Sequence, residues 1–221
     1  LSLCTILFIY IVAIPIGIYS ATHQYSGGDY LASVFGFIGL ATPPFLLALV
    51  VMYVLFDKFG VMPGGLISPE FAEARWGFAK IIDLLKHLIV PIVVLGMAGT
   101  AGLIRTVRAT LLDELNKDYV DTARVKGLTE TRLLMKYPVR IALNPIWSTI
   151  GYILPYTVSG ATIVSVVINL PTVGPLLLTA LLSQDMYLAG SIVLILTMLT
   201  LIGTFISDII LAISDPRIRY E

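Results

Sequence analysis

The side chains that could do chemistry are few in this chain, and they do not form the arrangement of an enzyme site. One cysteine, Cys4, and two histidines, His23 and His87, are too few for an internal disulfide or a zinc cluster. Neither the Gly-x-Ser-x-Gly turn of serine hydrolases nor the His-Glu-x-x-His pair of zinc hydrolases occurs. The phosphate-binding loop Gly-x-x-x-x-Gly-Lys-Ser/Thr is also missing. The sequence therefore predicts no catalytic residue, no metal site and no ATPase site of its own.

The longest polar stretch, residues 111–145, is patterned like two short helices. Its first part repeats at intervals of three and four, so that one face carries Leu112, Leu115, Tyr119, Thr122 and Ala123. Gly127 suits the left-handed position after a helix end, and Thr129 can cap a second helix with Glu130 in its first turn. Periodicity alone fits a solvated loop as well as a docking surface. The apolar face, the small alanine and the glycine bend together favour a compact surface for another protein.

These polar residues must be positioned by membrane helices, because 57% of the chain is hydrophobic and only 13% is charged. Soluble domains are about one quarter charged. The runs without Asp, Glu, Lys or Arg are 1–28, 30–56, 87–104, 141–184 and 186–207. Since a span needs roughly 20 apolar residues, we predict an all-α membrane protein, a polytopic helical bundle, with spans at about 1–21, 30–56, 87–111, 145–168 and 187–212. A signal peptide is the alternative for the first run, which lacks the basic start of such peptides.

Lysine and arginine are distributed unequally between the two sides of the predicted bundle. Ten lie in the 105–140 segment and the C-terminal tail, and four lie in the 57–86 segment. The positive-inside rule therefore places the 105–140 segment and the C-terminus in the cytoplasm. Because the chain starts inside an apolar run without methionine, we expect a further span upstream of Leu1. The formal net charge of zero gives no footprint for nucleic-acid binding.

A short motif within the polar stretch resembles that of a known family. Asp121-Thr122-Ala123, then three residues and Gly127, is similar to the Glu-Ala-Ala-x-x-x-Gly motif of the transmembrane permease subunits of binding-protein-dependent ABC importers. Two of the consensus positions differ. Asp118-Tyr119-Val120 and Lys126-Gly127-Leu128 resemble the variant in the oligopeptide, dipeptide and nickel branch, as do the segments 169–174 and 215–219. The resemblance covers essentially the whole chain, and it implies a permease of the type I ABC importer kind.

The resemblance implies that the segment 113–143 carries a coupling helix for a separate ATPase. The coupling residues would be Tyr119, Val120, Asp121, Ala123, Gly127 and Leu128. Ala123 and Gly127 would permit close approach, Tyr119 and Val120 would supply apolar anchors, and Asp121 would hold the helix through charge-assisted hydrogen bonds.

The resemblance also implies partners and a location. The partners would be a homologous permease subunit, two cytoplasmic ATPase subunits that bind the ATP, and an extracytoplasmic solute-binding protein, for which the aromatic outer segment 57–86 is a candidate contact. No cofactor of its own is expected. The location would be the inner membrane of a prokaryotic cell, and the cargo would be small peptides or a related solute.

Polar residues within the predicted spans offer two further hypotheses. Gly151, Pro155 and Ser159 form a small-residue face that is a candidate lining of the translocation pathway. Asp208 near the inner end of the last span is better explained by an ion pair with Arg105 or Arg108 than by a functional carboxylate.

Two other classes of protein compete with a permease. An autonomous secondary transporter or channel is one alternative, although midspan acidic residues and an evident internal repeat are missing. An intramembrane enzyme is the other, and it lacks the motifs named above.

Overall fold

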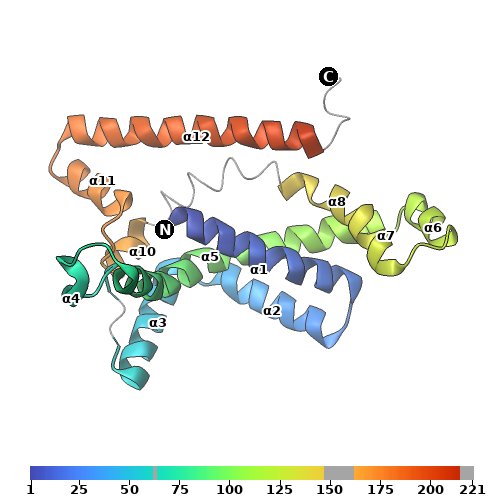
Figure 1. Cartoon of the computed structure of the whole chain (residues 1–221), viewed down its shortest axis with the longest axis horizontal. Helices are drawn as coiled ribbons and strands as arrows, with labels where there is room; N and C mark the ends of the chain where they lie inside the picture. The colour runs from blue at the N-terminus through green and yellow to red at the C-terminus, as the bar shows by residue number, and fades with distance from the viewer. Residues whose placement is uncertain (62–63, 147–161, 215–221) are drawn as a thin grey trace. The chain divides into compact units, whose positions relative to one another are not determined.

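The computed structural model describes residues 1–61, 64–146 and 162–214, and within these ranges every regular element is a helix (Figure 1). The predicted all-α membrane fold is therefore confirmed. The helices are α1 (Ser2–Thr22), α2 (Gly27–Ala41), α3 (Pro44–Phe59), α4 (Pro69–Ala72), α5 (Phe78–Leu115), α6 (Asp118–Val125), α7 (Glu130–Lys136), α8 (Pro138–Ala142), α10 (Thr162–Val167), α11 (Val173–Leu182) and α12 (Met186–Ser214).

Three described helices, α1, α5 and α12, are long and apolar enough to cross a membrane, and a fourth span results if α2 and α3 count as one broken span. Helices α1 and α12 follow the expected ranges closely. Helix α5 begins nine residues before the expected start at 87, because its first turns also carry Lys80, Asp83 and Lys86. Its 38 residues correspond to a length of about 57 Å, so its ends extend beyond the hydrocarbon core.

The single helix expected over 30–56 is wrong, because the structure interrupts it at Thr42 and Pro43. Pro43 has no backbone N–H, and it disfavours the helical conformation of the residue before it. Its own backbone is extended, with φ −57° and ψ 132°, and Pro44 then occupies the first turn of α3. The absence of charge made the stretch look continuous, whereas the paired prolines divide it. The span expected over 145–168 lies mostly outside the described residues, and α10 is the helix that the structure describes within it.

The chain forms two compact units, of which the first comprises residues 1–8, 41–98 and 153–200. Within the described part of this unit, Ala48 of α3 and Val94 of α5 pack with Val164, Ile168 and Leu170 at and after α10. Pro91 lies inside α5 without ending it. This core holds α3, α10 and the N-terminal half of α5 together.

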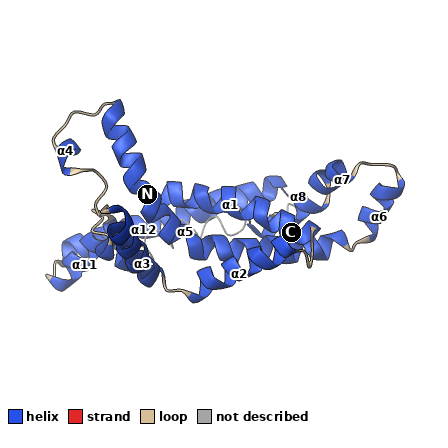
Figure 2. Ribbon diagram, turned by 90° about the horizontal axis from the view of Figure 1, so that it is seen from below, coloured by secondary structure: helices blue, strands red, loops and turns tan. Residues whose placement is uncertain are grey.

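The second unit comprises residues 9–40, 99–152 and 201–221. Its core lies between α1 and α5, where Ile9 and Ala13 meet Leu103, Ile104 and Val107 (Figures 1 and 2). A Cβ atom at Gly17 would lie 2.6 Å from Val107 Cβ, so this close helix contact requires glycine.

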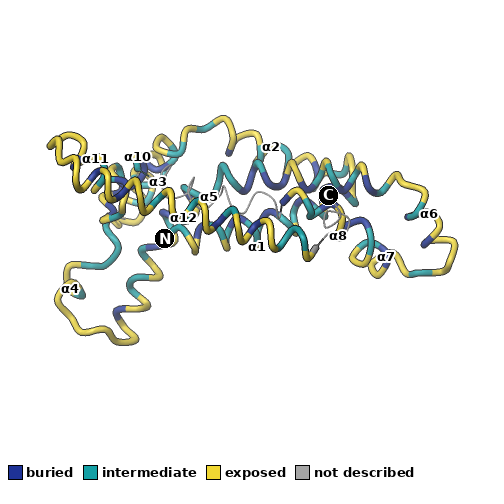
Figure 3. The backbone as a smooth tube through the Cα atoms, turned by 90° about the horizontal axis from the view of Figure 1, so that it is seen from above, coloured by how far each residue is buried: buried dark blue, intermediate teal, exposed yellow. Residues whose placement is uncertain are grey.

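Large apolar side chains are exposed along both α2 and α12, and Figure 3 colours the backbone by how far each residue is buried. Such faces suit lipid or a partner subunit rather than water.

Candidate functional site

The motif residues lie in a small helical assembly at the C-terminal end of α5, formed by α6, α7 and α8 (Figures 1 and 2). Helix α6 ends at Val125, and Gly127 then adopts the left-handed conformation with φ +78°. This arrangement of two short helices and a glycine bend agrees with the sequence pattern. Thr129 occupies the N-cap of α7 with an extended backbone, but its side chain makes no capping hydrogen bond. The predicted side-chain cap is therefore wrong.

The apolar face of α6 is directed toward α7. Val120 and Leu133 are fully buried, Ala123 is 7% exposed, and Tyr119, Leu128 and Tyr137 surround them. Val120 is therefore a core residue of this assembly, and its side chain offers no exposed area for the partner contact that was predicted from the sequence. Leu112 and Leu115 belong to a neighbouring core, because α5 stops at Leu115 and divides the expected face.

An exposed apolar residue that the sequence pattern did not single out lies on the opposite side of α6. Val125 is 88% exposed, although it carries a branched aliphatic side chain. It follows the buried Ala123 by two positions, which on a helix turns the side chain about 200° away. This offset is the signal in the sequence that could have identified Val125 as an outward-facing apolar residue.

A hydrogen-bonded group fixes the start of α6 to the end of α5. Tyr119 Oη donates to Glu114 Oε2 at 2.7 Å, and Lys117 Nζ donates to Glu114 Oε1. Glu114 is only 8% exposed. Burial, together with the hydrogen bond to this carboxylate, raises the pKa of Tyr119, so the phenol stays protonated and remains a donor. The group therefore sets the direction in which α6 leaves α5.

Arg124 joins α6 to α7 on the solvent side. Its Nε donates to Glu130 Oε1 at 2.7 Å, and its Nη1 donates to Asp121 Oδ1 at 2.9 Å. The guanidinium lowers the pKa of Glu130. Both acidic side chains are mostly exposed, so these pairs contribute little stability and mainly orient the side chains. Asp121 thus contacts Arg124 of its own helix, and it keeps an exposed carboxylate edge.

A hollow of about 580 Å³ opens beside α6, between the end of α5 and α8. Glu114, Tyr119 and Tyr137 lie around it together with Thr122, Ala123 and Leu128. Two lysines, Lys117 and Lys126, also border it. The mixture of aromatic, aliphatic and cationic groups can receive an apolar side chain flanked by carboxylates.

The structure brings the six motif residues into one helix and its following bend, as the pattern predicted. Gly151, Pro155 and Ser159, the predicted pathway lining, lie outside the described residues.

Asp208 is exposed, and the proposed pairing with Arg108 is wrong, because Arg108 binds Asp29 instead. Asp29 was not singled out, although it is the lone charge between two long uncharged runs.

Asp29 forms a buried ionic cluster that connects α1, α2 and α5. Arg108 donates from Nε and Nη2 to its two carboxylate oxygens at 2.8 and 2.9 Å. The Ser20 hydroxyl and the Tyr25 backbone N–H also donate to it. A buried carboxylate with this many donors is fully satisfied, so the cluster fixes the α1–α2 turn to α5.

A helical membrane protein with a helix–glycine–helix unit at the end of a spanning helix is the class that this fold and site define. The family profile described as "Binding-protein-dependent transport system inner membrane component" matches residues 13–220. The chain therefore belongs to this family of inner-membrane permease components of ABC importers, as its motif predicted.

Individual relatives agree with the family. The chain is similar to the oligopeptide transport system permease protein AppB of Bacillus subtilis (strain 168), with 36% identity over 220 residues, all of this chain and 68% of the relative. It is 33% identical over 225 residues to the inner membrane ABC transporter permease protein YejB of Escherichia coli O157:H7, covering 62% of that protein. It is 28% identical over 238 residues to the dipeptide transport system permease protein DppB of Escherichia coli (strain K12), covering 70%. The chain thus spans about two thirds of the length of these relatives.

Proposed function

We propose that this chain is a permease subunit of an ATP-driven importer of peptides or a related small solute, and that α6 is its coupling helix. The cargo class rests on the names of the relatives, two of which are oligopeptide and dipeptide permeases. The observation that carries the coupling role is the preassembled α6–Gly127–α7 unit, which has its own buried core at the end of a continuous spanning helix. A unit of this kind is rigid enough to transmit a displacement.

The contact with the ATPase would use the outward side of α6. Val125 supplies an exposed apolar side chain, and Asp121 supplies a carboxylate two thirds or more exposed. At Gly127 an added Cβ would meet nothing within 4 Å, so this bend is open to the close approach of a partner. A central apolar group beside a charged one is the composition of many interface hot spots.

Movement of the ATPase would reach the membrane through α5. The Glu114–Tyr119 hydrogen bond fixes the start of α6, and α5 continues without interruption from Leu115 back to Phe78. Between Pro91 and Leu115 no further proline interrupts the backbone hydrogen bonds of α5, so this part of the helix can move as one body over several turns. A shift of α6 would therefore tilt or translate the inner part of α5.

The partners would be a homologous permease subunit, two ATPase subunits and an extracytoplasmic solute-binding protein. Hydrolysis of ATP would take place on the ATPase subunits, since the chain carries no phosphate-binding loop. The family description itself names dependence on a binding protein.

The candidate surface for that binding protein is the loop around α4. Asp83 of α5 accepts hydrogen bonds from the Ser68 N–H and hydroxyl, both at 2.7 Å. Lys80 Nζ donates to the carbonyls of Ala72 and Ala74 at 3.1 and 2.8 Å. These bonds present Trp76, which is 68% exposed, on a fixed loop.

Reconstitution separates this proposal from an autonomous transporter. Vesicles would hold the purified permease pair with or without the ATPase subunits, and uptake of a labelled peptide with its binding protein would be measured. We expect uptake only when the ATPase subunits and ATP are both present. Uptake of the same size without the ATPase subunits would refute the coupling role and favour the autonomous alternative.

A further inference from the structure

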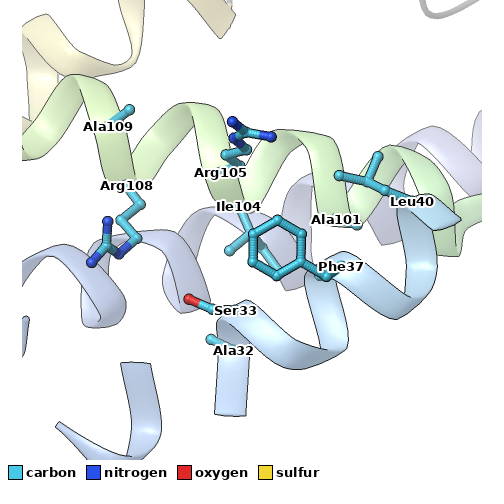
Figure 4. A pocket seen from close by; sticks show the side chains of 10 residues that line it. Ala32, Ser33, Phe37, Leu40, Ala101, Ile104, Arg105, Arg108 and Ala109 are labelled. Carbon is cyan, nitrogen blue, oxygen red and sulfur yellow. The ribbon is translucent and has the colours of Figure 1, made fainter. Parts of the chain in front are cut away.

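A pocket between α2 and α5 in the second unit has the composition of a lipid site. Its volume is about 210 Å³. Small residues form its walls, among them Ala32 and Gly36 of α2 and Ala101 of α5, while Phe37, Leu40 and Arg105 also border it (Figure 4). The hollow is thus apolar along α2, and it carries cations on α5.

The depth of Arg105 in the membrane follows from the sequence of α5. The stretch from His87 to Ile104 has no Asp, Glu, Lys or Arg, and its 18 residues correspond to about 27 Å of helix. That length matches the hydrocarbon core, which is about 30 Å thick. Arg105 is the first charge after this stretch, so its guanidinium lies at the level of the lipid head groups.

Arg105 differs from its neighbour Arg108 in having no anion within the described part of the chain. Arg108 takes both carboxylate oxygens of Asp29, and Ser20 and Tyr25 occupy that carboxylate further. Arg105 is exposed, and the residues three and four positions away on α5 are alanine, glycine and another arginine. One positive charge at the pocket is therefore not neutralised by any residue that the structure describes.

We propose that this pocket binds an anionic phospholipid, with the phosphate on Arg105 and an acyl chain along Phe37 and Leu40. The guanidinium can donate two hydrogen bonds to a phosphate, and the two apolar side chains are 61% and 47% exposed beside it. A zwitterionic lipid brings its own cation, so it would neutralise Arg105 less well. Basic pockets between membrane helices bind anionic head groups on the same grounds. This proposal does not depend on the coupling role of α6.

The test uses the purified complex after removal of lipid. Native mass spectrometry would count bound phosphatidylglycerol and phosphatidylcholine added at equal concentration, and inorganic phosphate would be a competitor. We expect phosphatidylglycerol to be retained selectively, and Arg105→Gln to weaken its binding by about tenfold, the equivalent of one charge-assisted hydrogen bond. Arg132→Gln changes an exposed arginine outside the spanning helices, so it should leave binding unchanged.

A second variant keeps the test informative if Arg105→Gln does not assemble. A Cβ atom added at Gly36 would have Ala101 O at 4.0 Å as its nearest contact, so Gly36→Leu should fit and fill the hollow. We expect it to reduce phosphatidylglycerol binding in an assembled complex. Equal retention of phosphatidylcholine, displacement by inorganic phosphate alone, or unchanged binding in both variants would overturn the proposal. Cross-linking of a cysteine at Phe37 to the second permease subunit would also overturn it, because a protein would then cover the pocket.

Discussion

At the scale of single residues, Gly127 and the Glu114–Tyr119 pair determine where α6 points. The glycine supplies a positive φ that residues with a Cβ adopt at a cost, and the buried carboxylate supplies a fixed acceptor. The left-handed glycine was predictable because it depends only on local conformation. The burial of Val120 was not, since it depends on Leu133 in the next helix.

Substitution of Gly127 tests whether the bend sets the direction of α6, the proposed coupling helix. Gly127→Val should cost about 1 kcal/mol or more in backbone strain, and it should abolish peptide uptake while the protein still inserts into the membrane. Gly127→Asn should restore much of the uptake, because asparagine tolerates the left-handed region. Gly60 has the similar φ of +64° in the first unit, so Gly60→Val is the matched control. Normal uptake in Gly127→Val would contradict this role.

Removal of one hydroxyl tests the attachment of α6 to α5. Tyr119→Phe keeps the ring but leaves the buried Glu114 without one donor, which should weaken the attachment by about 1.5–3 kcal/mol. We expect the complex to hydrolyse ATP while it moves less peptide per ATP. Tyr187→Phe changes a tyrosine that is 92% exposed, and it should leave the ratio unchanged. An unchanged ratio in Tyr119→Phe would show that this hydrogen bond does not determine how α6 is attached to α5.

At the scale of elements, the helices of the second unit are joined by the ionic cluster of Asp29 and Arg108. The two residues are 79 positions apart, so no local pattern indicated the pair. The break before α3 had a signal in Pro43 and Pro44, which the uncharged run obscured. Local backbone chemistry was therefore readable from the sequence, whereas contacts between distant helices were not.

The cluster predicts that removing one of its two charges destabilises the protein more than replacing both of them. Asp29→Asn leaves the Arg108 guanidinium without its anion, and it should destabilise the protein by about 3–5 kcal/mol. Replacement of both residues by apolar ones, Asp29→Leu with Arg108→Met, should regain most of this loss, because no unpaired charge remains. Thermal unfolding of the detergent-solubilised complex measures both. If Asp29→Asn were as stable as the wild type, the cluster would not be what holds α1, α2 and α5 together.

At the scale of the whole molecule, the composition indicates a membrane protein, and the family description names a transport system that depends on a binding protein. Its class and location were predictable, because hydrophobic runs and a short motif are properties of the sequence. The outward position of Val125 follows from the packing of α6 on α7, and its offset of two positions from Ala123 was the one signal for it in the sequence.

Cysteine cross-linking from Val125 is the sharpest test of the proposed contact between α6 and the ATPase. Cys4 is the one native cysteine, so Cys4→Ser gives a background without thiols in the chain. In the assembled complex, Val125→Cys should cross-link to the ATPase subunit, with a yield that changes when ATP is bound, whereas Trp76→Cys should not. An intact complex in which Val125→Cys forms no cross-link to the ATPase, with or without ATP, would contradict the claim.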